Sequence, residues 1–259
     1  MRVPIQMIGI ATTFFWIFLI TFFVSAVYSV KDLHFDFGEP QVSVNADNEV
    51  VFSLPVSIAN KGFYNIGSFN ISTEISDKED FAITCGSTFI QVIKKNDAVT
   101  VTHNMTLDVN DLLQRDQNYL FNDSELKIYE ALSMRVADAI PVQASTNFSM
   151  PWGAPLYNFS LGEPAYVRYN STHFRVTVLI SFDNHAFFDL VGDMRIRMYN
   201  STGVRVGKVR TSLEAYANSH YSGFVEFYVS MAGTTSTGRF EVDFSTSTFE
   251  YGPLVIPYG

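Results

Sequence analysis

The side chains that could carry out chemistry are few and scattered. The chain has one cysteine, Cys85, and no sequence neighbour of Cys85 would act as a base to activate the thiol, so we predict a small buried side chain there. His103 lies at an inward position of a predicted strand and is expected to be a hydrogen-bonded core residue rather than a metal ligand. The histidines follow no ligand spacing: His34, His103, His173, His185 and His220.

Sequence signatures of enzymes are also missing. The chain has no Gly-rich phosphate loop, no G-x-S-x-G elbow and no H-E-x-x-H pair. The acidic run Asp77-Lys78-Glu79-Asp80 could offer oxygen ligands to a calcium ion, but a solvated turn explains the same residues and is favoured. We therefore assign no catalytic, cofactor-binding or metal-binding residue, and expect a non-enzymatic protein without a cofactor.

Asn-X-Ser/Thr sequons form a clearer pattern. Seven occur where chance predicts about three. Asn70, Asn104 and Asn147 are at outward positions of predicted strands, and Asn170 and Asn200 are in turn sequences. No sequon therefore requires a buried glycan, which favours a glycosylated ectodomain. Accidental sequons in a β-protein rich in Ser, Thr and Asn are the alternative. The candidates are Asn70, Asn104, Asn122, Asn147, Asn158, Asn170 and Asn200.

Composition limits the partners. Seventeen Lys and Arg residues against 26 Asp and Glu give a net charge of -9, so nucleic acid would be repelled. Aromatic residues make up 15% of the chain and charged residues 17%, which indicates a packed protein rather than a disordered one. At 259 residues, one large or two small domains fit.

A membrane helix is predicted at 8–28, because no charged residue occurs between Arg2 and Lys31. The small residues at 24–26 and 27–29 leave a cleaved signal peptide as the alternative. Arg2 on one side, and Lys31 neutralised by Asp32 on the other, favour a cytoplasmic segment 1–7 and an extracellular remainder at the cell membrane.

The rest of the chain alternates apolar and polar residues, as half-buried antiparallel strands do. Gly38-Glu39-Pro40 recurs as Gly162-Glu163-Pro164, and Asn60 and Phe63 recur at the same offset of about 124 residues. We therefore predict an all-β ectodomain of two tandem β-sandwiches, 34–150 and 162–259, joined by a linker at 151–161.

Two segments need separate treatment. Residues 110–121 predict a short helix capped by Asn110. From 126 to 144 the apolar residues share one parity, which favours two strands bending near Pro141. Part of this segment also fits helical i, i+4 spacing, so a helix at 122–140 stays open.

Aromatic residues near the predicted linker exceed what turns need. They either pack the two domains together or form a partner-binding patch. The residues are Trp152, Tyr157, Phe187 and Phe188.

The layout of Val56–Asn60 followed by Phe63, and its repeat ending at Asn184 and Phe187, resembles the LEA14-like (WHy-type) β-sandwich family. Lys61 and His185 stand where that family usually has proline. The chain is also similar to anchored ectodomain proteins of archaea. The resemblance implies a fibronectin-like or immunoglobulin-like fold with a binding, protective or structural role and no catalytic residues.

These patterns favour a single-pass, membrane-anchored binding, scaffold or accessory protein of an archaeal cell envelope. Its partners would be the membrane and another envelope or membrane protein. A carrier of lipid or another apolar ligand is the alternative, and an extracytoplasmic enzyme comes third.

Overall fold

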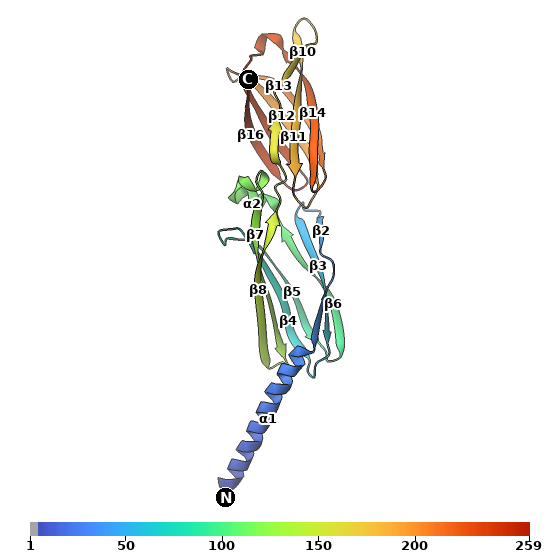
Figure 1. Ribbon diagram of the computed structural model, residues 1–259, viewed down its shortest axis with the longest axis vertical. Helices are drawn as coiled ribbons and strands as arrows, with labels where there is room; N and C mark the ends of the chain where they lie inside the picture. Colours follow the sequence, from blue (N-terminus) through green and yellow to red (C-terminus); the bar gives the residue numbers. More distant parts are fainter. Residues whose placement is uncertain (1–4) are drawn as a thin grey trace.

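The computed structural model describes residues 5–259, with side chains from Thr12 onward. The molecule is an elongated rod from which helix α1 (Ile5–Lys31) protrudes at one end (Figure 1). The helix exceeds the predicted 8–28 by three residues at each end, and its stretch Thr12–Lys31 is long and apolar enough to cross a membrane. Residues 1–4, most of the predicted cytoplasmic segment 1–7, lie outside the described residues.

Antiparallel strands form the body of the rod, as the alternating sequence predicts. In the N-terminal half, β3 pairs with β1, β2 and β6 in one sheet, while β5, β4, β7 and β8 form a second sheet in that order. The strands are β1 Leu33–Phe37, β2 Gln41–Val44, β3 Val50–Asn60, β4 Ile66–Ser76, β5 Ala82–Ile93, β6 Asp97–Leu107, β7 Ser124–Val136 and β8 Ile140–Trp152.

The C-terminal half repeats this pairing strand for strand. Here β11 pairs with β9, β10 and β14, while β13, β12, β15 and β16 form the other sheet. The strands are β9 Tyr157–Leu161, β10 Ala165–Arg168, β11 His173–Asn184, β12 Leu190–Asn200, β13 Arg205–Ala215, β14 Ser219–Ser230, β15 Gly238–Thr246 and β16 Glu250–Tyr258. The repeat seen in the sequence is therefore also a repeat of strand pairing.

The apolar residues of the two sheets meet inside each half. Val56 of β3 shares a buried cluster with Ile71 of β4, and Val178 of β11 shares one with Ile196 of β12. Burying each such side chain stabilises the fold by about 1.5–3 kcal/mol. The halves are thus sandwich-like.

The repeated Gly-Glu-Pro triplet interrupts one edge strand in each half. β1 and β2 pair with successive stretches of β3, and between them the Gly38 amide donates to the Pro55 carbonyl at 2.9 Å. In the same way, β9 and β10 pair with successive stretches of β11, and the Gly162 amide donates to the Leu179 carbonyl at 2.9 Å. Proline has no amide to donate, so the triplet ends one segment and allows the next to begin.

A fully buried asparagine, Asn60, fixes the turn after β3. Its Nδ2 donates to the carbonyls of Tyr64 (2.9 Å) and Ile93 (3.1 Å), and its Oδ1 accepts from the Gly62 amide (3.1 Å). The side chain therefore satisfies three buried backbone groups at once. We call residues 60–64 the Asn60 corner.

Asn184 reproduces this arrangement after β11. It is also fully buried, donates to the carbonyls of Phe188 (3.0 Å) and Ala215 (3.2 Å), and accepts from the Ala186 amide (3.1 Å). The Tyr216 carbonyl also lies 3.0 Å from Nδ2, so one of the two N–H groups is shared between two carbonyls. We call residues 184–188 the Asn184 corner.

Helix α1 ends against the Asn60 corner. The Ser29 hydroxyl is buried and accepts from the amides of Phe63 (3.0 Å) and Tyr64 (3.2 Å). A side chain on Gly62 would collide with Ser29, so glycine is required for this close approach. One turn earlier, Ser25 Oγ lies 2.7 Å from the Tyr64 hydroxyl.

The Asn184 corner receives the end of the N-terminal half in the same manner. The His185 amide donates to the Ala154 carbonyl at 3.0 Å, and a side chain on Gly153 would collide with the His185 carbonyl. Beside them the Trp152 ring packs on Phe187 with centroids 5.6 Å apart. Each corner therefore docks the chain segment that precedes its sandwich.

The predicted helix at 110–121 forms as α2 (Val109–Arg115) and the 3-10 turn η1 (Gln117–Leu120). The predicted cap at Asn110 is wrong. Asp108 caps α2, and its carboxylate accepts from the Asn110 amide at 2.8 Å, which places Asn110 inside the first turn.

Residues 126–144 form strands, so the helical alternative at 122–140 is wrong. The predicted bend near Pro141 is also misplaced, because the chain reverses at Ala137 and Asp138, which both have positive φ. The interruption between the halves is shorter than the predicted 151–161: only residues 153–156 lie outside strands, since β9 pairs with β11.

Replacing Asn184 by alanine would leave the buried carbonyls of Phe188 and Ala215 without this donor. We expect Asn184→Ala to lower the free energy of unfolding by at least about 2 kcal/mol. Urea titration of the full chain in detergent measures this loss. The control Asn147→Ala, at an exposed position, should change stability by less than about 0.5 kcal/mol; equal effects of the two substitutions would refute the role of the corner.

Candidate functional site: a cationic sheet face

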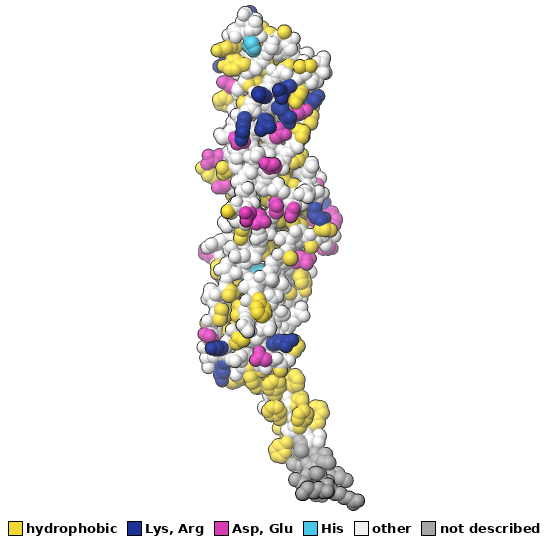
Figure 2. Space-filling view, turned by 180° about the vertical axis from the view of Figure 1, so that it is seen from behind, with side chains coloured by type: hydrophobic (Ala, Val, Ile, Leu, Met, Phe, Trp, Pro, Cys, Tyr) yellow, Lys and Arg dark blue, Asp and Glu magenta, His cyan; other side chains and the backbone are white. Residues whose placement is uncertain are grey.

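Six cations gather on the outer face of β13, β12 and β15, although the protein is acidic overall. On β12, Met194, Ile196 and Met198 are buried, so Arg195 and Arg197 point outward. Figure 2 shows Lys and Arg side chains gathered on the upper part of the rod. The patch, here called the cationic face, comprises Arg195, Arg197, Arg205, Lys208, Arg210 and Arg239.

Strand register brings like charges directly opposite each other on this face. Arg195 of β12 faces Arg210 of β13, and Arg197 faces Lys208. Like charges at opposed positions of an antiparallel pair destabilise the sheet. On the other side of β12, Arg195 lies opposite Asp243 of β15 and Arg197 opposite Glu241, so β15 offsets part of this repulsion.

Carboxylates neutralise only part of the cationic face. Arg210 pairs with Asp193 at 2.6 Å, and Arg197 pairs with Asp243 at 2.8 Å. Arg239 lies 3.2 Å from a Glu241 oxygen. Among the described residues, no carboxylate lies within 4 Å of the three remaining cations, which are Arg195, Arg205 and Lys208.

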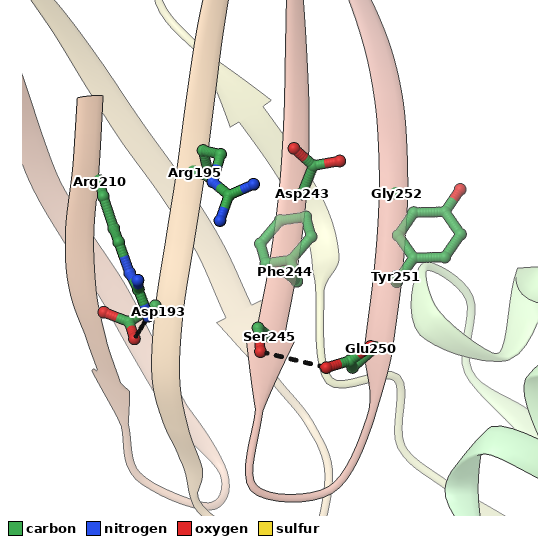
Figure 3. Close-up of a pocket in the computed structure, with 9 residues that line it drawn as sticks. All are labelled: Asp193, Arg195, Arg210, Asp243, Phe244, Ser245, Glu250, Tyr251 and Gly252. Carbon is green, nitrogen blue, oxygen red and sulfur yellow. Dashed lines mark hydrogen bonds and ion pairs between the residues drawn. The ribbon is translucent and has the colours of Figure 1, made fainter. Parts of the chain in front are cut away.

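Arg195 and Arg210 each line two open hollows. One, of about 480 Å³, is shown in Figure 3, where Arg210 bonds to Asp193 at one side and Tyr251 lies across from them. Its lining is Asp193, Arg195, Arg210, Asp243, Phe244, Ser245, Glu250, Tyr251 and Gly252. The other, of about 440 Å³, is lined by Arg195, Arg197, Arg205, Lys208, Val209 and Arg210.

The chemistry available in the second hollow is anion binding, because all its charged side chains are cations, whereas the first holds Asp193, Asp243 and Glu250 against two arginines. Planar guanidinium groups donate paired hydrogen bonds to carboxylate or phosphate oxygens. The Nε of Arg197 is buried without a hydrogen-bond partner, so a donor on this face is unsatisfied. Neither lining includes a histidine or a cysteine that could serve as a base or nucleophile.

Sequence analysis did not identify the cationic face. The pattern was visible as Arg195-Ile196-Arg197 and Lys208-Val209-Arg210, in which cations alternate with apolar residues on successive strands. Pairing those two strands as a hairpin would have placed the four cations on one face, but the register that opposes them is a property of the fold.

The histidine predictions meet different outcomes. His103 is buried as predicted, between the hydroxyls of Thr73 (2.9 Å) and Thr88 (2.8 Å), and burial lowers its pKa while nearby Glu130 partly opposes the shift. In the described part of the chain no three His, Cys, Asp or Glu side chains gather as a metal site would require.

His185 takes part in the junction between the halves. Its Nδ1 lies 2.9 Å from Asp123 Oδ2, and its ring stacks on Tyr157. Burial raises the pKa of Asp123, but hydrogen bonds from the Ala154 amide and from His185 outweigh it and hold that pKa below its ordinary value. The contact therefore supports the joint rather than a reaction.

Cys85 is exposed, so the predicted buried thiol is wrong. Its strand neighbour across β4 is Glu74, which is also exposed, and both side chains lie on the outward face of the sheet. The acidic run 77–80 forms a turn in which the Asp77 carboxylate accepts from the amides of Glu79 and Phe81.

Six of the seven sequon asparagines are accessible. Asn200 is the exception: it is only 8% exposed, donates to the Gly233 carbonyl and accepts from the Val204 amide, so its predicted exposure is wrong. Asn70 is partly exposed, and the exposed members are Asn104, Asn122, Asn147, Asn158 and Asn170.

The four aromatic candidates gather between the halves. Trp152 is 1% exposed, contacts both Phe187 and Phe188, and donates its indole N–H to the Tyr119 carbonyl at 2.9 Å. Tyr157 stacks on His185 with centroids 4.3 Å apart. The rings of Trp152, Phe187 and Phe188 pack against one another within the chain, and Trp152 has no surface to offer a partner.

Comparisons with known proteins give little further guidance. No protein-family model and no curated protein matches the chain. The crystal structure of red sea bream transglutaminase aligns with a TM-score of 0.31 and 12% identity over 88% of this chain, which spans 31% of that chain. A bacterial adhesin from Mobiluncus mulieris aligns with a TM-score of 0.32 and 11% identity, covering 80% of this chain and 79% of that one. Alignments this loose support no inference, and the LEA14-like resemblance stays a prediction.

Removing Arg195 should relieve the charge opposition on the cationic face. We expect Arg195→Thr to raise the free energy of unfolding by about 0.2–1 kcal/mol at low salt. The gain should vanish in concentrated salt, where exposed charges are screened. Arg210→Thr is the matched control, because it removes the same charge opposition but also the ion pair with Asp193. A loss of stability in Arg195→Thr at low salt would contradict the claim that these opposed charges destabilise the sheet.

Proposed function

We propose that the chain is a single-pass membrane protein whose two halves, 34–150 and 162–259, are tandem immunoglobulin-like domains of the LEA14-like type. They stand outside the cytoplasm as a binding, scaffold or accessory module of the cell envelope. The observation that carries this proposal is the docking of Ser29 at the Asn60 corner, because it makes an apolar helix part of the folded body.

The buried helix end favours a retained anchor over a cleaved signal peptide. Ala26 is 3% exposed and Ser29 is fully buried. Cleavage after either residue would remove or disrupt the turn that accepts the amides of Phe63 and Tyr64. Each buried amide left without an acceptor costs about 1–3 kcal/mol.

The junction holds the second domain in line with the first. One buried cluster runs from Leu112 and Leu120 of the N-terminal half through Trp152 to Phe188. Polar contacts at the rim add to it, since the Glu250 amide donates to Asn110 Oδ1 at 3.1 Å. The cationic face is therefore presented at a fixed height, far along the rod from α1 (Figure 1).

The hollow lined by five cations and no carboxylate favours an anionic partner. Both hollows on the cationic face are open and lined mainly by charged or polar side chains, unlike the apolar pockets that enclose small ligands. An acidic surface of another envelope protein fits the hollow of five cations better than an apolar cargo, so the binding role is preferred to the carrier role.

The anchoring and its orientation can be tested on intact cells that express the full chain. Protease added outside should digest residues beyond 31 and leave a membrane-bound helix, and alkaline washing should not extract the undigested chain. Digestion that requires lysis would contradict the orientation. Recovery of a soluble chain beginning at residue 27 or 30 would contradict the anchor.

The binding role can be tested by a photo-crosslinking residue placed at Arg195 of the full chain in its source cells. We expect an acidic membrane or envelope protein to be captured there, and competition by salt to reduce its yield. A crosslinker at Phe224, which is 63% exposed on the other sheet, is the control. Equal capture at both positions, or none at Arg195, would contradict a partner site on the cationic face.

A further inference from the structure

We propose that the base of the rod rests directly on the lipid surface, with Phe63 among the headgroups and Lys61, Lys94, Lys95 and Arg135 bound to anionic lipids. The base consists of the Asn60 corner and the neighbouring turns at 94–97 and 135–139. This inference rests on the proposed anchoring by α1 and adds a lipid-binding surface to the folded domain.

Because α1 is only long enough to span the bilayer and contact the base, the base must lie at the bilayer surface. Tyr64 of the Asn60 corner contacts α1 at Phe22, with ring centroids 5.7 Å apart, so the base overlaps the helix from Phe22 to Lys31. The stretch without charge runs from Val3 to Val30. A hydrocarbon core of about 30 Å takes about 20 helical residues, and counting from Ile5, where α1 begins, these end at Val24, beyond Phe22. Tyr64 therefore lies no farther out than the edge of the core.

Phe63 is exposed where its counterpart is covered. In the Asn184 corner the equivalent residue, Phe187, packs on Trp152 and Phe52 at the junction. In the Asn60 corner Phe63 is 56% exposed, beside the emerging helix. Because both corners dock what precedes them, the surface left for Phe63 is the lipid around α1.

Cations surround Phe63. Lys61 precedes it, and Lys95 Nζ lies 6.0 Å from its ring centroid. Lys94 and Arg135 are exposed on adjacent turns, and Figure 2 shows Lys and Arg side chains at the base of the body just above the apolar helix. The acidic residues of the base are Asp32, Asp97 and Asp138, and no ion pair within 4 Å joins them to these cations in the described chain. Lysine and arginine at this depth attract anionic headgroups.

Quenching of tryptophan by brominated lipid tests the proposal on the full chain. A Trp16→Phe background removes the tryptophan of α1, and Trp152 is buried at the junction in every variant. The Phe63→Trp chain is then placed in vesicles containing phosphatidylglycerol and phosphatidylcholine brominated near the carbonyl end of its chains. We expect the tryptophan introduced at position 63 to lose most of its fluorescence.

Phe224→Trp is the matched control, because that position is similarly exposed but lies on the distal half. The fluorescence of the tryptophan introduced at position 224 should not change. If the chain resists alkaline washing yet the Phe63→Trp chain is quenched no more than the Phe224→Trp chain, the anchor stands and this proposal is overturned. If washing removes the chain from the vesicles, the anchor itself fails and the proposal fails with it.

A variant without the four cations tests the role of charge separately. Replacing Lys61, Lys94, Lys95 and Arg135 by glutamine in the Phe63→Trp chain should abolish the additional quenching that phosphatidylglycerol gives over phosphatidylcholine alone. If the Phe63→Trp chain that keeps all four cations is quenched equally with and without phosphatidylglycerol, the assignment of those cations to anionic lipid is overturned.

Discussion

Two buried side-chain amides, those of Asn60 and Asn184, hold the corners on which the rest of the rod depends. Each amide satisfies backbone groups from the turn itself and from a neighbouring strand, so the turn cannot move without leaving polar groups unpaired in the interior. Because each turn is fixed, its outer surface can bind the chain segment that precedes it. The Asn60 corner binds the end of α1, and the Asn184 corner binds the end of the N-terminal half. The same arrangement thus joins the helix to the N-terminal half and the N-terminal half to the C-terminal half.

The distribution of charge follows the length of this rod. Residues 32–156 contain 7 Lys and Arg against 17 Asp and Glu, whereas residues 157–259 contain 8 against 9. The cations of the N-terminal half lie partly at the base, beside α1, and those of the C-terminal half gather on the cationic face. The acidic surface between them repels nonspecific anionic contacts. We infer that the two ends interact with different anionic surfaces, lipid at the base and a protein partner at the cationic face.

Much of the architecture was predictable because alternation and repeats are local properties of sequence. The parity of Val176, Val178 and Ile180 predicts their burial, and the recurrence of Asn60 as Asn184 marks equivalent corners. Features that depend on pairing were missed. Cys85 is exposed because of its register with Glu74, and the cationic face arises because Arg195 comes to lie opposite Arg210. Asn200 sits in a turn sequence typical of exposed residues, yet its amide is used to bond the turn from within.

The central claim is that α1 and the first sandwich form one rigid body. Spin labels at Val27 on the exposed side of α1 and at Phe89 on β5, in a Cys85→Ser background, would report their separation by pulsed dipolar spectroscopy in lipid nanodiscs. These positions are 70% and 63% exposed, so labels should not disturb the packing. A docked helix predicts one narrow distance distribution, unchanged between detergent and lipid. A broad distribution would show that the helix swings freely from the body and would contradict the account.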